Sequence, residues 1–280
     1  MNAICFFTFR PPKQIFDFAK KLKTHEYNIF VSINDNNYII PEYDENAITI
    51  IKLDDIIVKD AGYFNSNNNI RGHVCSRDKA FYYFNKINTI DYKFIWFIEE
   101  DVFIPTTKTI NNIDIKYPYG DYLSNSYFTV CDDIDKYKDT LNINLDFPIV
   151  TFNNNYSFHE SSSFREYNLM HYFNLPWLKS MSCAIRVSKN FLEHIDIFVK
   201  KHNTLFFDEV LYPTISLHNN LVIVNPIELT PIVYRCDFNN VDNITNYLYW
   251  NFNDIREDYL FHPIKDLDLH QKLRDDHNFN

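Results

Sequence analysis

The chain has 280 residues, of which 46% are hydrophobic and 23% are charged, and this balance excludes collagen-like, coiled-coil and wholly disordered proteins. The formal net charge is −10 at pH 7, which argues against a general binder of phosphate backbones, so we expect no nucleic-acid partner. The five cysteines show no CxxC spacing, and the sequence contains neither a secretion leader nor a long uncharged apolar run. We therefore expect a cytoplasmic protein with reduced thiols and no membrane anchor.

Strands and helices alternate in the first hundred residues. Continuous apolar runs predict buried strands, and apolar residues at helical spacing predict amphipathic helices. The predicted strands are 3–9, 27–33, 48–53 and 92–98, and the predicted helices are 13–23 and 77–87. This alternation is typical of an α/β domain with a largely parallel sheet.

The rest of the chain predicts no second domain. Residues 110–156 are rich in Asn, Asp and Tyr and predict mixed strands and loops, whereas helical spacing returns at 189–201 and 208–216. The run 175–184 is interpreted as a wall on which sugar rings stack, with Trp177 as a platform or, alternatively, as a core residue. A charged, helix-like run ends the chain, and no repeat or linker is found, so we expect one domain over 1–280.

Three carboxylates, Glu99, Glu100 and Asp101, follow the strand that we expect to be central. In parallel sheets ligands bind beyond the carboxyl ends of the strands. Carboxylates this close repel one another, and a hard cation such as Mg²⁺ or Mn²⁺ relieves the repulsion while it holds substrate phosphates. The alternative is a solvated acidic turn that caps the next segment.

The sequence around this acidic strand end resembles a known family. Residues 75–84 (CSRDKAFYYF), followed by 94–104 (FIWFIEEDVFI), look like the DxD region of GT-A glycosyltransferases. They are similar in particular to the Golgi N-acetylglucosaminyltransferases that start complex N-glycan branches, which also place a basic helix with an aromatic residue and Ala before an acidic strand end. The resemblance covers about 1–110. It implies a single GT-A-like (Rossmann-like) domain with a mixed, mostly parallel sheet flanked by helices, in which 1–110 bind the nucleotide sugar and 111–280 bind the acceptor and include the C-terminal tail.

The resemblance also implies roles for the residues at the strand ends. Asp101 matches the carboxylate that ligates the metal, and Glu99 and Glu100 match those that face the ribose or the water shell of the metal. Glu stands where the family has Asp at two of these three places. Thr8, Phe9 and Arg10 occupy the strand end that receives the nucleotide base. Asp35 matches a carboxylate that contacts the base or ribose, and its alternative is an ordinary Asx turn.

Positive charge for the diphosphate is expected from the helix 77–87. Arg77 and Lys79 lie in its first turn, where either could stand beside the phosphates, although a helical lysine is usually solvated. Asp78 is expected to stabilise the N-terminus of this helix.

A second acidic pair, Asp208 and Glu209, lies in the very apolar run 205–213. Burial of this kind would raise the pKa of a carboxyl group, which suits a general base that takes a proton from a sugar hydroxyl. In inverting GT-A enzymes a carboxylate in the second half of the chain has this role, so we expect Glu209 to be the base and Asp208 to cap the helix or hold the acceptor. The alternative is that the pair only begins a helix.

The run 261–265 supplies the last candidates. Many GT-A enzymes end the catalytic domain with a histidine that completes the metal shell, which His262 matches, and with a basic group on the departing nucleoside diphosphate, which Lys265 matches. Imidazole beside carboxylate oxygens suits Mn²⁺ better than Ca²⁺. The alternative is that His262 is an ordinary core or surface histidine.

These expectations combine into one function. The chain is expected to be a metal-dependent glycosyltransferase that uses Mn²⁺ or Mg²⁺ and a nucleoside diphosphate sugar, with a UDP-sugar favoured, and that transfers the sugar to a hydroxyl of a glycan or protein. The alternatives are a nucleotidyltransferase, a sugar-nucleotide hydrolase, or an inactive GT-A relic that binds a sugar or nucleotide.

Composition bears on the source and on the rival folds. With 26 Phe, 20 Tyr and abundant Asn, Ile and Lys, the chain is similar to soluble glycosyltransferases of large DNA viruses or protists, so a viral enzyme of the host cytoplasm or virion is expected. Only 3 Gly are present, and neither a dinucleotide-binding GxGxxG nor a P-loop nor a GxSxG elbow occurs. A dehydrogenase, a P-loop kinase and an α/β-hydrolase are therefore disfavoured.

Overall fold

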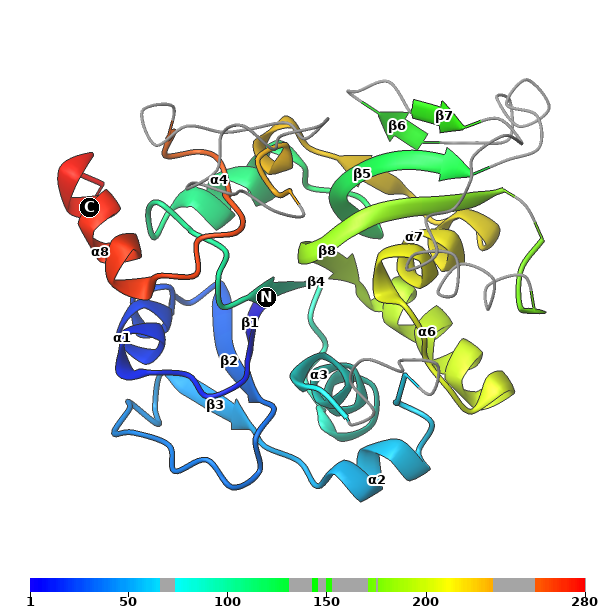
Figure 1. Cartoon of the computed structure of the whole chain (residues 1–280), viewed down its shortest axis with the longest axis horizontal. Coiled ribbons are helices and arrows are strands. Elements are labelled where there is room, and N and C mark those ends of the chain that lie inside the picture. Colours follow the sequence, from blue (N-terminus) through cyan, green and yellow to red (C-terminus); the bar gives the residue numbers. More distant parts are fainter. Residues whose placement is uncertain are drawn as a thin grey trace, which may run out of the picture.

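The computed structural model of the protein describes residues 1–65, 74–130, 143–145, 150–152, 171–174, 176–233 and 255–279. Their strands form one sheet with helices on its faces (Figure 1). The strands are β1 (Asn2–Thr8), β2 (Tyr27–Ile33), β3 (Ile48–Ile51), β4 (Phe94–Glu99), β5 (Tyr122–Val130), β6 (Ile143–Leu145), β7 (Val150–Phe152), β8 (Trp177–Ser188) and β9 (Ile223–Asn225). The helices are α1 (Lys13–Lys21), α2 (Asp55–Asp60), α3 (Ser76–Tyr82) with its π-helical continuation η1 (Tyr83–Ile87), α4 (Thr109–Lys116), α6 (Lys189–His202), α7 (Asp208–His218), the 3₁₀ turn η3 (Ile227–Leu229) and α8 (Leu267–Asp276).

The strand order is β3-β2-β1-β4-β8-β5-β9-β6, and β7 pairs with β5. β8 is antiparallel to both of its neighbours, β4 and β5, and the remaining pairs are parallel. The predicted mixed, mostly parallel α/β sheet flanked by helices is confirmed. Every strand and helix predicted in the first hundred residues is present, with ends shifted by a few residues.

Several elements differ from the sequence-based expectation, among them the short helix α2 and the strand β9, neither of which was predicted. Residues 175–184 were expected to form a wall before a helix, but most of them belong to β8, a strand of 12 residues. The region expected to hold mixed strands and loops also contains α4. Trp177 is a core residue, since it is buried and its indole N–H donates a hydrogen bond to the Phe173 carbonyl oxygen.

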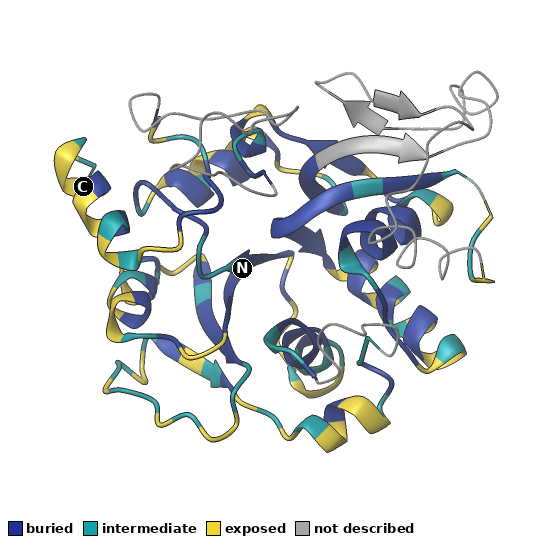
Figure 2. Cartoon of the chain, viewed as in Figure 1, coloured by how far each residue is buried: buried dark blue, intermediate teal, exposed yellow. Residues whose placement is uncertain are grey.

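The core has a layer on each face of the sheet. Alternate residues of β1 and β4 pack on one side against α3, α6 and α7, and on the other side against α1 and α4. Burial on both faces explains why these strands are continuous apolar runs rather than alternating ones. Figure 2 shows the result, with buried strands in the centre and exposed residues on the outer helices.

The topology defines where a ligand is expected to bind. The chain runs outward from β1 to β2 and β3, and then returns to β4 on the other side of β1. In open parallel sheets the crevice outside such a reversal of strand order is the usual ligand site. The carboxyl ends of β1 and β4, at Thr8 and Glu99, flank this reversal.

Among the described residues, no helix combines the length and apolar character needed to cross a bilayer. Cys5, Cys75 and Cys183 are free thiols, and the first and last of these are buried. Cys131 and Cys236 lie outside the described residues.

A buried ion pair joins the two halves of the sheet. Arg186 on β8 is fully buried, and its Nη1 atom lies 2.8 Å from Oδ1 of Asp114 on α4. Its guanidinium group also donates to the carbonyl oxygens of Tyr117 and Tyr119. Asp114 accepts further hydrogen bonds from the indole N–H of Trp96 on β4, the hydroxyl group of Tyr27 on β2 and the side-chain amide of Asn2 on β1, so one carboxylate ties α4 to four strands.

We expect Asp114→Ala to lower the free energy of unfolding by about 3–5 kcal/mol, because it leaves the buried Arg186 charge without its carboxylate. Urea denaturation followed by circular dichroism measures this loss. The matched control is Asp17→Ala, which removes the exposed partner of Lys13 and should cost less than about 1 kcal/mol. Equal losses in the two variants would contradict a structural role for the buried pair.

Candidate functional site

The acidic strand end is held in place by backbone hydrogen bonds. Glu99 is the last residue of β4, and Glu100 and Asp101 form the turn after it. The Glu100 N–H donates to the Phe7 carbonyl oxygen of β1 at 3.1 Å, and the Val102 N–H donates to the Glu99 carbonyl oxygen at 3.1 Å. The three carboxylates therefore lie at the reversal of strand order, where the topology predicts a ligand site.

Arg77 joins several elements at this place. Its guanidinium group is buried, and Nη2 lies 2.5 Å from Glu99 Oε1 and 3.2 Å from the Ser182 carbonyl oxygen. Its Nη1 atom forms an ion pair with Asp208. Burial alone would lower the pKa of Arg77, but the charge of Glu99 raises it above its usual value. Arg77 thus stays charged and connects α3 with β4, β8 and α7.

We expected Asp208 to cap α7 or to hold the acceptor, and the structure shows that it is not the cap. The N-cap residue is Phe207, and Asp208 is the first residue of the helix. Its carboxylate is directed to Arg77 and to the hydroxyl group of Ser182, which donates a hydrogen bond to it. The Asp208 carboxylate forms an ion pair with the buried guanidinium group of Arg77 instead of a capping hydrogen bond at the start of α7.

Glu209 is buried on α7, next to Asp208 in the chain. Its Oε2 atom lies 3.8 Å from the ammonium group of Lys179 on β8. The sequence brings the two acidic residues together, and the structure gives them different partners. Asp208 belongs to the Arg77 network, whereas Glu209 faces a lysine.

His262 reaches the acidic strand end from the far end of the chain. Its Nε2 atom lies 3.4 Å from Asp101 Oδ1 and 3.8 Å from Glu99 Oε2. Its Nδ1 atom lies 2.6 Å from the Val233 carbonyl oxygen, which can only accept a hydrogen bond. Nδ1 therefore carries a proton, and the lone pair of the neutral ring is on Nε2, toward the carboxylates.

The two partners shift each other's pKa. Burial would lower the pKa of His262, but the hydrogen bond and charge of Asp101 raise it above its usual value. Burial would raise the pKa of Asp101, but His262 lowers it. The two residues predicted as metal ligands are thus adjacent, and they form an ion pair when His262 is protonated.

The segment 261–265 is fixed by backbone hydrogen bonds to the residues after β4. Phe103 and Phe261 exchange N–H to carbonyl hydrogen bonds, and the Ile264 N–H donates to the Asp101 carbonyl oxygen at 2.8 Å. Lys265 follows on the surface, and its charge contributes to the lowered pKa of Asp101.

Cys183 is a neighbour that the sequence analysis missed. A carboxylate oxygen of Glu99, the Cys183 sulfur and a ring nitrogen of His262 all lie within 4.8 Å of one another. The sequence did not indicate that Cys183 lies beside Glu99, because 175–184 was not recognised as a strand. Once β8 is known to pair with β4, the pairing of Ile98 with Ala184 brings Cys183 beside Glu99.

The first strand end offers an exposed aromatic ring and an exposed cation. Thr8 is buried, and its hydroxyl group donates to the Ser32 carbonyl oxygen. Phe9 is 51% exposed, and the Arg10 guanidinium carbon lies 5.2 Å from the centre of its ring. Arg10 also forms an ion pair with Asp35 at 2.6 Å.

Asp35 forms an Asx turn, which was the alternative to a contact with the base or ribose. Its Oδ1 atom accepts a hydrogen bond from the Asn37 N–H at 2.8 Å. This hydrogen bond and the one from Arg10 lower the pKa of Asp35. The carboxylate still lies at the carboxyl end of β2, beside the exposed Arg10.

Lys79 points away from Arg77. Its ammonium group is fully buried and lies 2.7 Å from the Asn34 carbonyl oxygen, 2.8 Å from Asn36 Oδ1 and 2.8 Å from Asp55 Oδ1. Residues two apart on a helix do not face the same side, which explains the different directions. Lys79 thus holds the loop after β2. Asp78 stabilises the N-terminus of α3, as expected, since its carboxylate accepts from the Cys75 N–H in a capping box.

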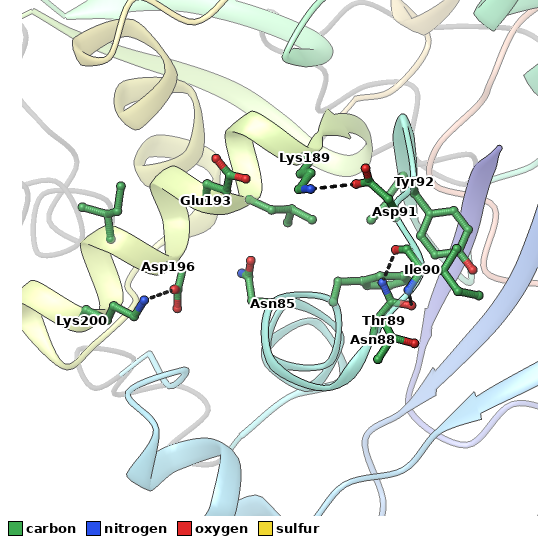
Figure 3. A pocket seen from close by; sticks show the side chains of 14 residues that line it. Asn85, Asn88, Thr89, Ile90, Asp91, Tyr92, Lys189, Glu193, Asp196 and Lys200 are labelled. Atoms are coloured by element: carbon green, nitrogen blue, oxygen red, sulfur yellow. Dashed lines mark hydrogen bonds and ion pairs between the residues drawn. The ribbon is translucent and has the colours of Figure 1, made fainter.

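A separate cavity of about 470 Å³ lies between η1, the loop before β4 and α6. Figure 3 shows two ion pairs along it, Lys189 with Asp91 and Lys200 with Asp196. None of the predicted site residues lines it. It lies near the amino end of β4, whereas the candidate site lies at the carboxyl end.

The chain was also compared with known proteins. No family model matches it, and the search of curated proteins finds no match.

Glu100 makes the free energy of unfolding depend on pH. Burial, with the charges of Asp101 and Glu99, raises the pKa of Glu100 to about 7, against a hydrogen bond from the Phe9 backbone that lowers it. The folded chain holds this proton more tightly than the unfolded chain, whose pKa is about 4.5. The stability from this proton is therefore fully present below about pH 4.5 and is lost as the pH rises through about 7.

We expect Glu100→Gln to remove this contribution. Between pH 4.5 and 7.5, with a chelator present, the unfolding free energy of the wild type should fall by about 2 kcal/mol more than that of the variant, after allowance for partial exposure. Urea titrations over the pH series measure the difference. Glu193→Gln, which removes an exposed carboxylate of α6, is the control and should follow the wild type. Parallel curves for wild type and Glu100→Gln would contradict the assignment.

Proposed function

We propose that the protein is a metal-dependent glycosyltransferase that moves a sugar from a nucleoside diphosphate sugar, with a UDP-sugar favoured, to a hydroxyl group of a glycan or protein. One observation carries the proposal. Asp101, His262 and Glu99 lie together at the carboxyl end of β4, where the strand order reverses. Carboxylate oxygens and imidazole are ligands that suit a divalent cation which also binds phosphates.

The donor set fits a divalent cation. Asp101 and His262 would hold it, with Glu99 Oε2 on the third side. The chemistry that such a cation supplies is neutralisation of charge on the departing diphosphate. Lys265, on the surface close to Asp101, adds positive charge for the same phosphates.

The nucleotide would lie along the ends of β1 and β2. Phe9 offers an exposed ring face for a base, and Arg10 and Asp35 offer a donor and an acceptor for polar groups of the base or ribose. Thr8 is buried beneath this edge, and its hydroxyl group donates a hydrogen bond to the Ser32 carbonyl oxygen, which links β1 to β2. These residues would position the donor.

Glu209 is the proposed proton acceptor. Asp208 is occupied by Arg77 and Ser182, so its role is to keep Arg77 and Glu99 in place. Glu209 is buried on the same helix, and Lys179 faces it. In the proposed reaction the oxygen of the acceptor hydroxyl forms a bond to the sugar carbon, the bond from that carbon to the diphosphate breaks, and Glu209 takes the hydroxyl proton.

Thermal melting with UDP, GDP, CDP and their sugars, with and without Mn²⁺, tests the donor site. A ligand at a hundredfold excess over its dissociation constant should stabilise the wild type by about 2.7 kcal/mol, or raise the melting temperature by roughly 5–10 °C. The shift should require Mn²⁺ and should be lost in Asp101→Asn and His262→Gln. Asp91→Asn, in the separate cavity, should keep it.

Product analysis separates the proposal from its rivals. Transfer to an acceptor hydroxyl supports it, and Glu209→Gln should lower that rate at least a hundredfold while it leaves the melting shift unchanged. Release of pyrophosphate would instead indicate a nucleotidyltransferase, and release of sugar phosphate a hydrolase. If no nucleotide gives a metal-dependent shift, the glycosyltransferase proposal is wrong.

A further inference from the structure

A buried thiol lies on the protein side of the candidate metal site. Cys183 is 7% exposed and stands on β8 beside Glu99, the last residue of β4. Its position is fixed by the strand pairing rather than by a surface loop. A thiol in this place adds a donor of a different chemical class to the carboxylates and imidazole.

The distances suit one cation. The donor atoms of Glu99, Cys183 and His262 lie within 4.8 Å of one another, and the nitrogen of His262 is 3.8 Å from Glu99 Oε2 and 3.4 Å from Asp101 Oδ1. A tetrahedral zinc ion with ligands at about 2.0–2.3 Å separates them from one another by about 3.3–3.8 Å. The two distances from His262 to the carboxylate oxygens fall within this range, and small side-chain rotations would complete a shell with the Cys183 sulfur.

We propose that the site binds a borderline divalent cation of the zinc and cobalt class, with Cys183 as a thiolate ligand beside His262 and Glu99. The inference rests on the metal site of the proposed function and goes beyond it, since it assigns a new ligand and with it a preference among cations. On binding, the S–H bond of Cys183 breaks, its proton passes to solvent, and a metal–sulfur bond forms. No electron is transferred in this step.

The neighbouring contacts already orient the other ligands. His262 donates from Nδ1 to the Val233 carbonyl oxygen, which directs Nε2 to the cation and is the usual arrangement of a ligating histidine. Glu99 binds Arg77 through Oε1, so its Oε2 atom faces His262. Binding would therefore need little rearrangement and would leave the Arg77 pair intact.

The burial of the ligands indicates an open coordination position. Cys183 and His262 are buried, whereas the side chains of Glu99 and Asp101 are 31% and 21% exposed. A cation here would be closed in by protein on one side and reachable from solvent on the other. Structural zinc sites are closed by four protein ligands, while catalytic ones keep a position for substrate or water.

The thiolate ligand predicts which cations bind well. Soft thiolates favour Zn²⁺ and Co²⁺, whereas Mg²⁺ and Mn²⁺ favour oxygen ligands. Cys183→Ser should therefore weaken Zn²⁺ and Co²⁺ binding at least tenfold and change Mn²⁺ binding by less than about threefold. Such a difference between cations is not expected from a general loss of folding.

Cobalt spectroscopy on the full chain tests the inference. The metal-free protein is titrated with Co²⁺, with and without UDP, and a thiolate-to-cobalt charge-transfer band in the near ultraviolet is recorded, together with calorimetric Zn²⁺ and Mn²⁺ affinities. Cys75→Ser is the matched control, because Cys75 is the N-cap residue of α3 and serine is a good N-cap. Circular dichroism confirms that each variant is folded, and His262→Gln provides a second variant of the same shell.

The inference is supported if wild type and Cys75→Ser show the band, Cys183→Ser lacks it, and both Cys183→Ser and His262→Gln lose Zn²⁺ affinity. Co²⁺ binding without the band, or unchanged Zn²⁺ affinity in Cys183→Ser, overturns the inference and leaves the proposed function standing. If the wild type binds none of these cations with or without UDP, the inference and the metal site of the proposed function both fail.

Discussion

The arrangement of the site depends on one buried cation, the guanidinium group of Arg77. Burying this charge costs hydration free energy. The ion pairs with Glu99 and Asp208 and the hydrogen bond to the Ser182 carbonyl oxygen offset that cost. These contacts allow α3, the end of β4 and the start of α7 a single relative position. The same contact gives the two oxygens of Glu99 different surroundings, because Oε1 faces Arg77 and Oε2 faces His262.

The second constraint is the way in which the other two carboxylates of the strand end avoid mutual repulsion. His262 lowers the pKa of Asp101 and so favours its charged form. Burial and the charges of Asp101 and Glu99 raise the pKa of Glu100, so Glu100 shifts toward its neutral form. His262 can reach Asp101 because backbone hydrogen bonds join Phe103 to Phe261 in both directions. The electrostatics of the strand end are therefore completed by a segment that lies far away in the sequence.

These contacts explain how much could be predicted from sequence. Most elements of the first hundred residues were predictable because β1, β2 and β4 are buried on both faces, so each appears as a mostly apolar run with polar residues at its end. β8 was missed because Lys179, Ser180 and Ser182 interrupt its apolar pattern, although Ser180 is buried and shares a hydrogen bond with Tyr122. The partners of Asp208 were equally hidden, since no local pattern shows that Arg77 will cross to another helix.

The missed strand also supplies the thiol on which the proposed choice of cation depends. Glu99 and Asp101 belong to the turn after a parallel strand, and their oxygens alone would suit a hard cation that remains largely hydrated. β8 runs antiparallel to β4 and brings the buried Cys183 beside Glu99. Under the proposed function, the oxygen ligands on the open side would serve the phosphates, and the buried sulfur and imidazole would set which cation stays bound between turnovers. In the cluster of Glu99, Cys183 and His262, the acidic motif would then contribute one donor, strand pairing a second and the segment 261–265 the third.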